Sequence, residues 1–461
     1  MFNLLSFALV LVLFVAAAYL IRAKQNLPPS PVGFPVIGHL HLLKDPVHRR
    51  LRDLSQSLGP VFSLRLGSCR AVVVTSASAA EEFLSHENDV VFANRPITTM
   101  YAYVLYSNTG VSVAPYGDHW RHLRRICTTE IFSAARLRES FEIRRDEVRS
   151  MLQTIHAATL RGNNSVRLIS ETFELGGFTY VGDFLPILKL FDFDGYVKKS
   201  KKLGSKLDKF LQELVDEHRG NRGKTEFKNT MITHLLTLQE SQPESYTDQI
   251  IKGLVLVMLF AGSDTTSVTL EWAMANLLNH PDVLMKVKTE LNNLVSRERR
   301  LMEESDTSTC TYLDNVISET LRLCPAAPLL VPHASSGDCK VAGYDIPRGT
   351  WLFINAWAIQ RDPKIWDEPE VFKPERFDSE GWKTQHGKFL PFGMGRRACP
   401  GMGLAQLILS LALGSLIQCF DWERDEDVAV DMSEGKGLTM PKALSLVAKC
   451  KSSSILDNVV I

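Results

Sequence analysis

A long uncharged stretch in the second half of the chain limits what the chain can fold into. Thr247 and Asp248 are a typical helix start, and Pro281 stops the helical pattern after His280. A helix over these residues would be about 50 Å long, which exceeds the usual length in globular proteins. Gly253–Ser263 carries no charge, so we expect it to be buried, and it is too short to span a membrane. The helix therefore predicts a large, mainly helical body that it crosses.

A carboxylate follows directly inside this apolar helix. Asp264 comes immediately after the uncharged stretch and precedes Thr265 and Thr266. A buried carboxylate is costly unless it is paired or has a function. A kink filled by a back-bonding hydroxyl explains Thr266 structurally, whereas Asp264 and Thr265 are interpreted as a functional pair.

The composition is that of a globular protein. The 461 residues carry 52 Lys and Arg against 52 Asp and Glu, and 45% of them are hydrophobic. These values exclude a mostly disordered chain and argue against a nucleic-acid partner that depends on a basic field. The eight cysteines form no C-x-x-C pair, so neither a zinc ribbon nor a small disulfide scaffold is expected, and a reducing compartment is favoured.

The amino end predicts a membrane anchor over residues 1–22. Phe2–Ile21 is almost unbroken apolar sequence, long enough as a helix to cross a bilayer. A cleaved signal peptide is the alternative, because Ala16–Ala18 offers a cleavage site. However, there is no basic segment before the apolar run, and the run continues past Ala18. Arg22 and Lys24 supply a positive flank that favours a single span with the rest of the chain in the cytosol.

The remainder divides into a linker over residues 23–38 and a body over 39–461. Four prolines between Leu27 and Pro35 predict a stiff, extended spacer. In the body, we expect a hairpin near its start, a second β region and charged amphipathic helices. These lie at Val61–Leu66 with Ala71–Thr75, at Lys340–Asn355, and at Ser140–Leu160 and Lys199–His218.

A glycine-rich loop before an apolar helix is the most specific pattern in the chain. The loop covers Pro391–Gly401 and the helix Met402–Ile417. Its glycines let the backbone approach a flat group closely. A cysteine just before a helix N-terminus has a lowered thiol pKa and favours the thiolate. The pattern F-x-x-G-x-R-x-C-x-G is met by Phe392, Gly395, Arg397, Cys399 and Gly401.

With this loop, the whole chain resembles the cytochrome P-450 haem-thiolate monooxygenases. It is most similar to microsomal plant members, close to the isoflavone 2'-hydroxylase-like family. The resemblance implies the cytochrome P-450 fold, which is mainly α with a small β sheet, preceded by one transmembrane helix. It implies haem b as the cofactor, Cys399 as the axial ligand of the iron, and Phe392, Gly395 and Arg397 as parts of the haem-binding loop.

Further motifs carry the same resemblance. Trp120 and Arg124 match the family's W-x-x-x-R, whose indole and guanidinium suit a haem propionate. His333, after Pro332, matches the position of another propionate donor, although a surface-loop histidine is the alternative. Ala261–Thr266 matches A-G-x-D-T-T, in which Thr265 would hold a hydrogen bond to the distal oxygen and Asp264 would relay protons.

A structural charge network is also implied. Glu319 and Arg322 lie three apart on one helix face and match the family's E-x-x-R. Arg376 lies in a P-E-R-F sequence and would complete the network behind the haem. Loss of one member would leave a buried charge unpaired.

The resemblance implies a function. The chain would hydroxylate a lipophilic, flavonoid-like aromatic metabolite with O2 and electrons from an NADPH-cytochrome reductase, at the endoplasmic reticulum membrane. Apolar pocket walls are expected at Pro96–Pro115, on the long helix before Asp264, at Ala326–Val331 and at Leu438–Thr439.

One departure from the family defines the alternative function. The chain looks short near residues 164–170, where the family has another helix and a loop. A chain shortened there could instead be a membrane-anchored haem binder, or a folding-defective variant without turnover.

Overall fold

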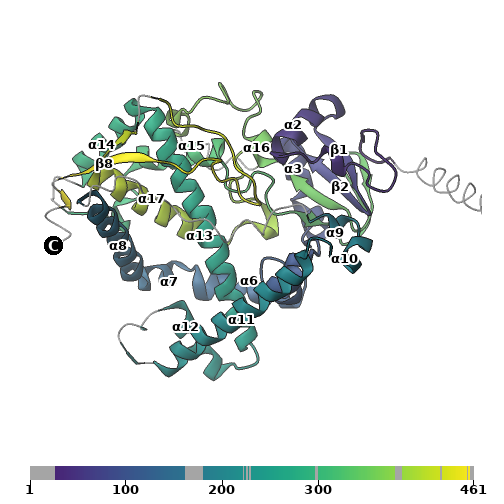
Figure 1. The fold of residues 1–461 in the computed structure, drawn as a ribbon, viewed down its shortest axis with the longest axis horizontal. Helices are drawn as coiled ribbons and strands as arrows, with labels where there is room; N and C mark the ends of the chain where they lie inside the picture. The colour runs from purple at the N-terminus through teal and green to yellow at the C-terminus, as the bar shows by residue number, and fades with distance from the viewer. Residues whose placement is uncertain are drawn as a thin grey trace, which may run out of the picture.

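The computed structural model describes residues 26–160, 180–221, 223–224, 227, 230–295, 300–378, 387–425, 428–453 and 455–456. The predicted anchor over residues 1–22 and the shortened segment near 164–170 lie outside these ranges. The described part is mainly helical, with three small sheets, as the sequence predicts (Figure 1).

The largest sheet has the strand order β1-β2-β6-β3. Strands β1 (Val61–Leu66) and β2 (Cys69–Val74) form the predicted antiparallel hairpin, because Gly67 and Ser68 turn the chain between them. Strand β6 (Trp351–Ile354) runs parallel to β2 and antiparallel to the short β3 (His333–Ala334). Two hairpins complete the β structure: β4 (Cys339–Val341) with β5 (Tyr344–Ile346), and β7 (Phe420–Arg424) with β8 (Ala448–Ser452).

Most of the helices lie on the other side of the molecule from this sheet, and the others pack beside it (Figure 1). Those before the long helix are α2 (Val47–Leu58), α3 (Ala77–Phe83), α4 (His86–Val91), α5 (Thr99–Val104), α6 (Asp118–Ile126), α7 (Ala134–Glu139), α8 (Phe141–Leu160), α9 (Val181–Phe184), α10 (Ile187–Phe191), α11 (Tyr196–Gly220) and α12 (Met231–Ser241). Those from the long helix onward are α13 (Asp248–Asn279), α14 (Pro281–Leu294), α15 (Thr311–Leu323), α16 (Ala356–Ile359) and α17 (Met402–Cys419).

Helix α13 crosses the centre of the body, with the predicted bounds (Figure 1). The side chain of its N-cap, Thr247, accepts a hydrogen bond from Ile250 N at 3.3 Å. The first turns of α13 pack in an apolar cluster with α11 and α12. The half from Val268 onward packs in the main core with α14, α15 and α17. Helices α13 and α17 are both long and apolar enough to cross a membrane, but they build this core.

The expectation that the whole uncharged stretch of α13 is buried is wrong for its second half. The residues from Gly253 to Leu256 are buried, but Leu259 is 46% exposed and Ala261, Gly262 and Ser263 are exposed as well. The two apolar clusters cover the ends of the helix, and the described residues leave its middle open. The absence of charge therefore does not predict burial along the whole stretch, because the described chain covers only its first half.

The described part of the proline-rich segment lies on the large sheet and is not a free spacer. Ser63 N of the edge strand β1 donates to Pro29 O at 2.7 Å, and Asn26 N donates to Asp345 Oδ2 at 2.8 Å. His39 Nδ1 accepts a hydrogen bond from Arg65 N at 2.7 Å, and its Nε2 donates to Pro31 O at 2.9 Å. These bonds fix the segment against the body.

Candidate active site

The cysteine loop is held in a conformation that requires glycine. A single 3-10 turn, Gly395–Arg397, precedes Cys399, and α17 begins three residues after it. Gly395 has a φ of 70°, and a Cβ at this position would lie 2.6 Å from Asp89 Oδ1 and 2.8 Å from Leu84 O. Any other residue would be strained and would clash. Cys399 N donates to Phe392 O at 2.9 Å, which closes the loop.

Asp89, on α4, supports this loop and was not identified by the sequence motifs. Arg396 N donates to both of its carboxylate oxygens, at 3.1 and 3.0 Å. The side chain is buried, and burial raises its pKa while the Arg396 N–H and guanidinium lower it. Asp89 lies far from the loop in sequence and in no motif, so only the folded chain reveals the contact.

The environment of Cys399 differs from the sequence expectation. Burial raises the pKa of its thiol, and the Gly401 N–H and the charge of Arg124 only partly oppose this. Part of Cys399 is exposed to solvent, but protein atoms surround its sulfur, so burial is the largest influence on the thiol pKa. The direction is thus opposite to the one that the helix N-terminus predicts, and a bound metal cation would lower the thiol pKa.

Four basic side chains gather beside the loop. Arg397 Nε donates to Ala93 O at 2.6 Å and Nη1 to Val111 O at 3.2 Å. Arg124 Nη1 donates to Ala398 O at 2.7 Å. Arg95 Nη1 donates to Val331 O at 2.5 Å and to Pro332 O at 2.9 Å. His333 is buried and its Nδ1 donates to Phe92 O at 2.8 Å, so it is not a surface-loop histidine.

These four groups are close enough to repel one another. Burial and the charges of Arg95 and Arg124 lower the pKa of Arg397 to about 9. Burial lowers the pKa of Arg95 to about 10, and burial with the charges of Arg95 and Arg397 holds the pKa of His333 well below 6.5. Among the described residues, the three guanidinium groups donate hydrogen bonds only to backbone carbonyls, and no carboxylate pairs with them.

The arrangement fits a dianion such as the two propionates of haem. Arg95 Nε is buried and has no hydrogen-bond partner among the described residues. A buried, unpaired donor in an uncompensated cationic cluster is costly without an anionic ligand. Arg95 was missed by the sequence analysis because it belongs to none of the motifs. Its position before Pro96, at the start of an expected pocket wall, was the only available signal.

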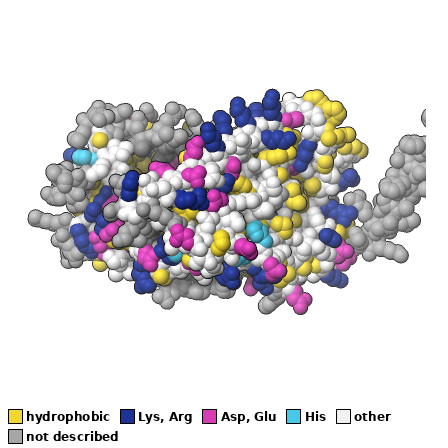
Figure 2. Space-filling view, turned by 90° about the horizontal axis from the view of Figure 1, so that it is seen from below, with side chains coloured by type: hydrophobic (Ala, Val, Ile, Leu, Met, Phe, Trp, Pro, Cys, Tyr) yellow, Lys and Arg dark blue, Asp and Glu magenta, His cyan; other side chains and the backbone are white. Residues whose placement is uncertain are grey.

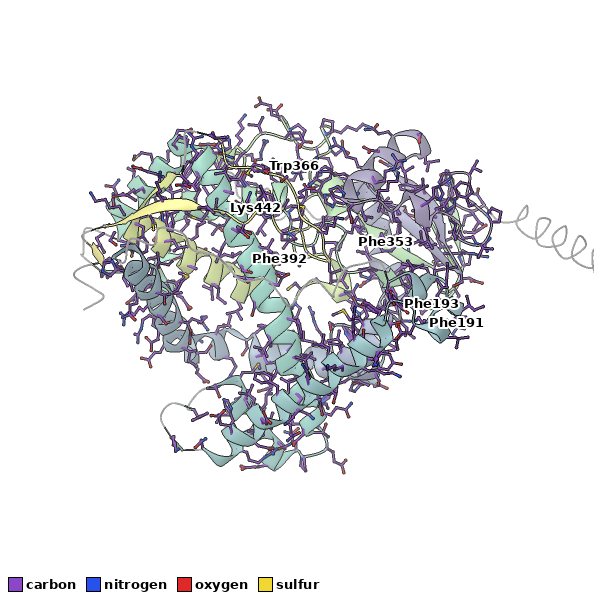
Figure 3. The ribbon with its side chains drawn as sticks, viewed as in Figure 1. Phe191, Phe193, Phe353, Trp366, Phe392 and Lys442 are labelled. Carbon is purple, nitrogen blue, oxygen red and sulfur yellow. The ribbon has the colours of Figure 1, made fainter. Side chains whose placement is uncertain are left out.

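Two motif residues have roles that differ from a direct contact to a propionate. The indole Nε1 of Trp120 donates to Val111 O at 3.0 Å and is therefore already paired. Its ring lies under the guanidinium of Arg397, 4.5 Å from the ring centroid, which supports that arginine through a cation–π contact. Phe392 is partly buried and packs against the α13–α15–α17 core (Figure 3).

The Asp264–Thr265 pair lies on α13 in an apolar setting. Asp264 is buried, and burial raises the pKa of its carboxyl, with a hydrogen bond to Thr439 opposing the shift. Its Oδ2 finds no partner in the described part of the chain. Thr265 Oγ1 donates to Ala261 O at 2.6 Å. The expectation that Thr266 is the back-bonding hydroxyl is therefore wrong, because Thr265 makes this bond.

Glu319, Arg322 and Arg376 come together in the core. Arg322 binds Glu319 through two bonds, Nε to Oε2 at 2.7 Å and Nη2 to Oε1 at 2.9 Å, and both side chains are fully buried. Arg376 Nε donates to Glu319 Oε1 at 3.0 Å, and Lys373 N donates to the same oxygen at 2.8 Å. The remaining guanidinium nitrogens bind backbone carbonyls, Gln360 O among them. One carboxylate and two guanidinium groups thus share a network that is nearly saturated with hydrogen bonds.

Two cavities contact the expected pocket walls. The smaller cavity lies between the start of the Pro96–Pro115 wall and the Leu438–Thr439 wall, and its lining includes Pro96, Tyr101, Trp351 and Leu438. A larger one of about 200 Å³ lies between the end of that wall and the first turns of α13, with Val111, Leu123 and Leu254 in its lining. Three of the four expected walls thus contribute to the lining of one cavity or the other.

The chain is similar to known proteins over most of its length. The cytochrome P450 family matches residues 28–174 and 161–447. The chain is 50% identical over 477 residues to cytochrome P450 81Q32 of Catharanthus roseus, covering 95% of this chain and 94% of that protein. It is 44% identical over 500 residues to the isoflavone 2'-hydroxylase of Glycyrrhiza echinata, covering 99% of each. A solved zebra fish cytochrome P450 superposes with a TM-score of 0.74 at 25% identity, over 88% of this chain and 100% of that one. Since both the sequence and the fold match over most of their length, the chain belongs to the cytochrome P450 monooxygenase family.

Proposed function

We propose that the chain is a haem-thiolate hydroxylase of a lipophilic, flavonoid-like aromatic metabolite. The observation that carries the proposal is the buried, uncompensated cluster of Arg95, Arg124, Arg397 and His333 beside the Cys399 loop. The named hydroxylase among the relatives acts on an isoflavone, which supports an aromatic substrate. The apolar linings of the cavities support a lipophilic one.

Each residue of the proximal side has a distinct task. Haem b, when bound, would supply the activation of O2, with Cys399 as its thiolate ligand. Arg95, Arg124 and Arg397 would bind the propionates, and Trp120 would hold Arg397 in place. His333 would join them, because a neighbouring carboxylate favours the imidazolium and so raises its pKa. Glu319, Arg322 and Arg376 would keep the proximal core rigid.

On the distal side, Asp264 and Thr265 would manage protons. The raised pKa of Asp264 brings its carboxyl closer to the range in which it can both give and take a proton. The hydroxyl proton of Thr265 is engaged with Ala261 O, so its oxygen lone pairs remain able to accept a hydrogen bond. Asp264 would thus supply the proton, and the oxygen of Thr265 would accept a hydrogen bond that orients it.

The replacement Cys399→Ser tests the ligand assignment. We expect the wild-type chain to give the thiolate-type Soret maximum in its reduced, CO-bound spectrum and the variant to lose both this maximum and turnover. Cys339→Ser is the control, because its half-buried thiol lies on β4 and in none of the haem motifs. Monooxygenase turnover that survives Cys399→Ser would refute the assignment.

We further propose that residues 1–22 anchor the chain in the endoplasmic reticulum membrane. Residues 23–38 would link the anchor to a cytosolic catalytic domain over 39–461. An NADPH-cytochrome reductase would donate electrons at the basic surface of Arg121, Arg125, Arg136 and Arg138. The Arg121 side chain is half exposed and pairs with the exposed Asp118, so an acidic partner could exchange for that contact.

The double replacement of Arg121 and Arg125 by Glu tests this surface. We expect it to slow reductase-driven turnover most at low salt, because exposed charges act mainly on the association rate. Peroxide-driven turnover needs no reductase and should be unchanged. Equal losses in both assays would show that the two arginines support the haem site instead.

A second candidate is a haem binder or folding-defective variant without turnover. Two observations favour it. The 500 aligned positions with the isoflavone 2'-hydroxylase exceed the 461 residues of this chain, and the two family matches meet at residues 161–174, next to the expected shortening. The reduced, CO-bound spectrum of the full chain separates the candidates, because an absent or shifted Soret maximum would favour this one.

A further inference from the structure

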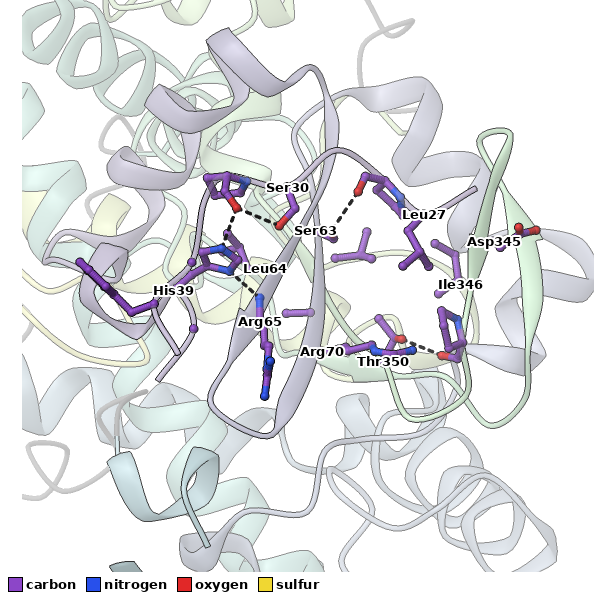
Figure 4. A pocket seen from close by; sticks show the side chains of 18 residues that line it. Leu27, Ser30, His39, Ser63, Leu64, Arg65, Arg70, Asp345, Ile346 and Thr350 are labelled. Carbon is purple, nitrogen blue, oxygen red and sulfur yellow. Dashed lines mark hydrogen bonds between the residues drawn. The ribbon is translucent and has the colours of Figure 1, made fainter. Parts of the chain in front are cut away.

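A groove at the end of the molecule that holds β1 and β2 takes no part in the proposed reaction. It has a volume of about 320 Å³ and lies between the segment from Leu27 to His39, the outer face of the β1–β2 hairpin, and the turn after β5 (Figure 4). Its lining includes Ser63, Arg65 and Arg70 of the hairpin. The groove is therefore separate from the cysteine loop and from α13.

Two arginines face each other on the hairpin. Arg65 and Arg70 are directly opposite in the register of β1 and β2, and both are exposed. Like charges directly opposite one another destabilise a strand pair. Arg65 Nε donates to Gly67 O at 3.1 Å, and neither guanidinium pairs with a described carboxylate. The acid of the groove, Asp345, is already engaged with Asn26 N. This side of the groove is therefore a cationic surface that an anion would stabilise.

Exposed apolar side chains flank the arginines on both sides. On one side, Val32 is 96% exposed, and Phe34 and Val36 are also exposed. On the other side, Leu190 and Phe193 are 82% and 83% exposed, and Phe191 stacks on Phe193 (Figure 3). Hydrophobic side chains gather at this end of the molecule in Figure 2. Soluble surfaces rarely expose such a set without a partner.

The hairpin turn joins the two apolar groups into one surface. Gly67 N donates to Ile37 O at 3.1 Å, and Ser68 N donates to Phe184 O at 2.8 Å. The turn residues thus contact the N-terminal segment on one side and the end of α9 on the other. The surface combines two unpaired guanidinium groups at its centre with apolar side chains around them.

We propose that this groove binds the phosphate headgroup of an anionic membrane lipid. Arg65 and Arg70 would bind the phosphate oxygens, which suit the planar donor pattern of guanidinium, and the apolar side chains would enter the adjoining acyl region. The inference rests on the membrane location in the proposed function. A lipid is favoured over free phosphate because the arginines stand between exposed apolar groups. In addition, the described chain begins at Asn26, shortly after the apolar stretch Phe2–Ile21 and beside the groove.

The test uses the full chain in a neutral detergent. Binding of water-soluble, short-chain phosphatidylglycerol is compared with that of short-chain phosphatidylcholine and of inorganic phosphate. We expect the wild type to bind phosphatidylglycerol most tightly. Arg65→Gln with Arg70→Gln should weaken this binding about thirtyfold, because each basic residue near an anionic lipid surface contributes roughly fivefold. The control pair Arg149→Gln with Lys209→Gln removes the same charge from exposed positions on α8 and α11 and should leave the affinity unchanged.

Each arm has an outcome that would overturn the proposal. Phosphatidylcholine binding as tightly as phosphatidylglycerol would show that net negative charge is not recognised. Inorganic phosphate binding as tightly would show that the groove does not select a lipid, and equal losses in the two double variants would indicate unspecific charge. The reduced, CO-bound spectrum is recorded on every sample. A chain that lacks the thiolate-type maximum but still binds phosphatidylglycerol through Arg65 and Arg70 would refute the proposed function and retain the lipid site.

Discussion

The replacement Glu319→Gln should be among the most destabilising single-atom changes in this chain. The carboxylate accepts four hydrogen bonds, two from Arg322, one from Arg376 and one from Lys373 N, and the side chains of Glu319 and Arg322 are fully buried. Glutamine would turn one acceptor oxygen into an NH2 group that points at a guanidinium donor. It would also remove the carboxylate that pairs with Arg322, the only one to do so among the described residues. Breaking a buried ion pair in this way costs about 3–5 kcal/mol.

A matched control lies in the same part of the core. The Glu375 carboxylate also accepts hydrogen bonds, from Lys286 Nζ at 2.6 Å and from the Tyr312 hydroxyl at 2.8 Å, but its side chain is 37% exposed. Because solvent screens this pair, Glu375→Gln should cost at most about 1 kcal/mol. The free energy of unfolding of both variants can be measured by urea denaturation of the full chain in detergent, with tryptophan fluorescence as the readout. Equal losses in the two variants, or a loss below about 1 kcal/mol for Glu319→Gln, would refute the reasoning.

Three further predictions concern the site and its pH dependence. Thr265→Ala should let NADPH consumption continue while product per NADPH falls by roughly a hundredfold, as is typical for the loss of one positioned hydrogen-bonding group. Thr266→Ala, the control, should keep the wild-type ratio of product to NADPH. If both variants keep this ratio, the proton role is refuted. Asp89→Ala should lower the free energy of unfolding by about 1–3 kcal/mol, because it leaves Arg396 N unpaired. It should also reduce the fraction of chain with the thiolate-type CO spectrum, and an unchanged spectrum would exclude a positioning role for Asp89. In the chain without haem, the buried histidines His39 and His333 have lowered pKa values, so below about pH 6.5 the unfolded chain binds protons that the folded chain does not. The stability of the haem-free chain should therefore be full above that pH and fall by up to about 1.4 kcal/mol per pH unit for each histidine below it. Urea midpoints of the haem-free chain that stay constant between about pH 7.5 and 5.5 would contradict this.

Local patterns were enough to predict several of the secondary-structure elements. The N-cap at Thr247 and the stop at Pro281 set the bounds of α13 because both act through the neighbouring backbone. The alternating residues and the Gly67–Ser68 turn set the β1–β2 hairpin for the same reason. The loop around Cys399 was found because its glycines and its cysteine are spaced by backbone requirements of the loop itself, such as the positive φ at Gly395.

The contacts that depend on distant segments could not be predicted. Asp89 reaches a loop about three hundred residues away in sequence, and Arg95 joins its cluster only because the strand that holds His333 lies beside it. The thiol pKa of Cys399 was predicted from the helix N-terminus alone, but burial by the whole fold decides its direction. The hydroxyl of Thr265 turns back to Ala261 O, a rotamer choice that no sequence pattern reports.

The chain buries two charge clusters, and the difference between them indicates which one needs a ligand. The Glu319 cluster contains its own carboxylate, which pairs with both of its guanidinium groups, and backbone carbonyls satisfy the remaining guanidinium nitrogens when the chain folds. Among the described residues, Arg95, Arg124 and Arg397 donate hydrogen bonds only to backbone carbonyls, and the charges of Arg95 and Arg124 lower the pKa of Arg397. A group that binds the folded chain and supplies two carboxylates would remove this repulsion, and by mass action it would add to the free energy of unfolding. Folding and haem binding should therefore be coupled through the second cluster, whereas the first should contribute equally with and without haem.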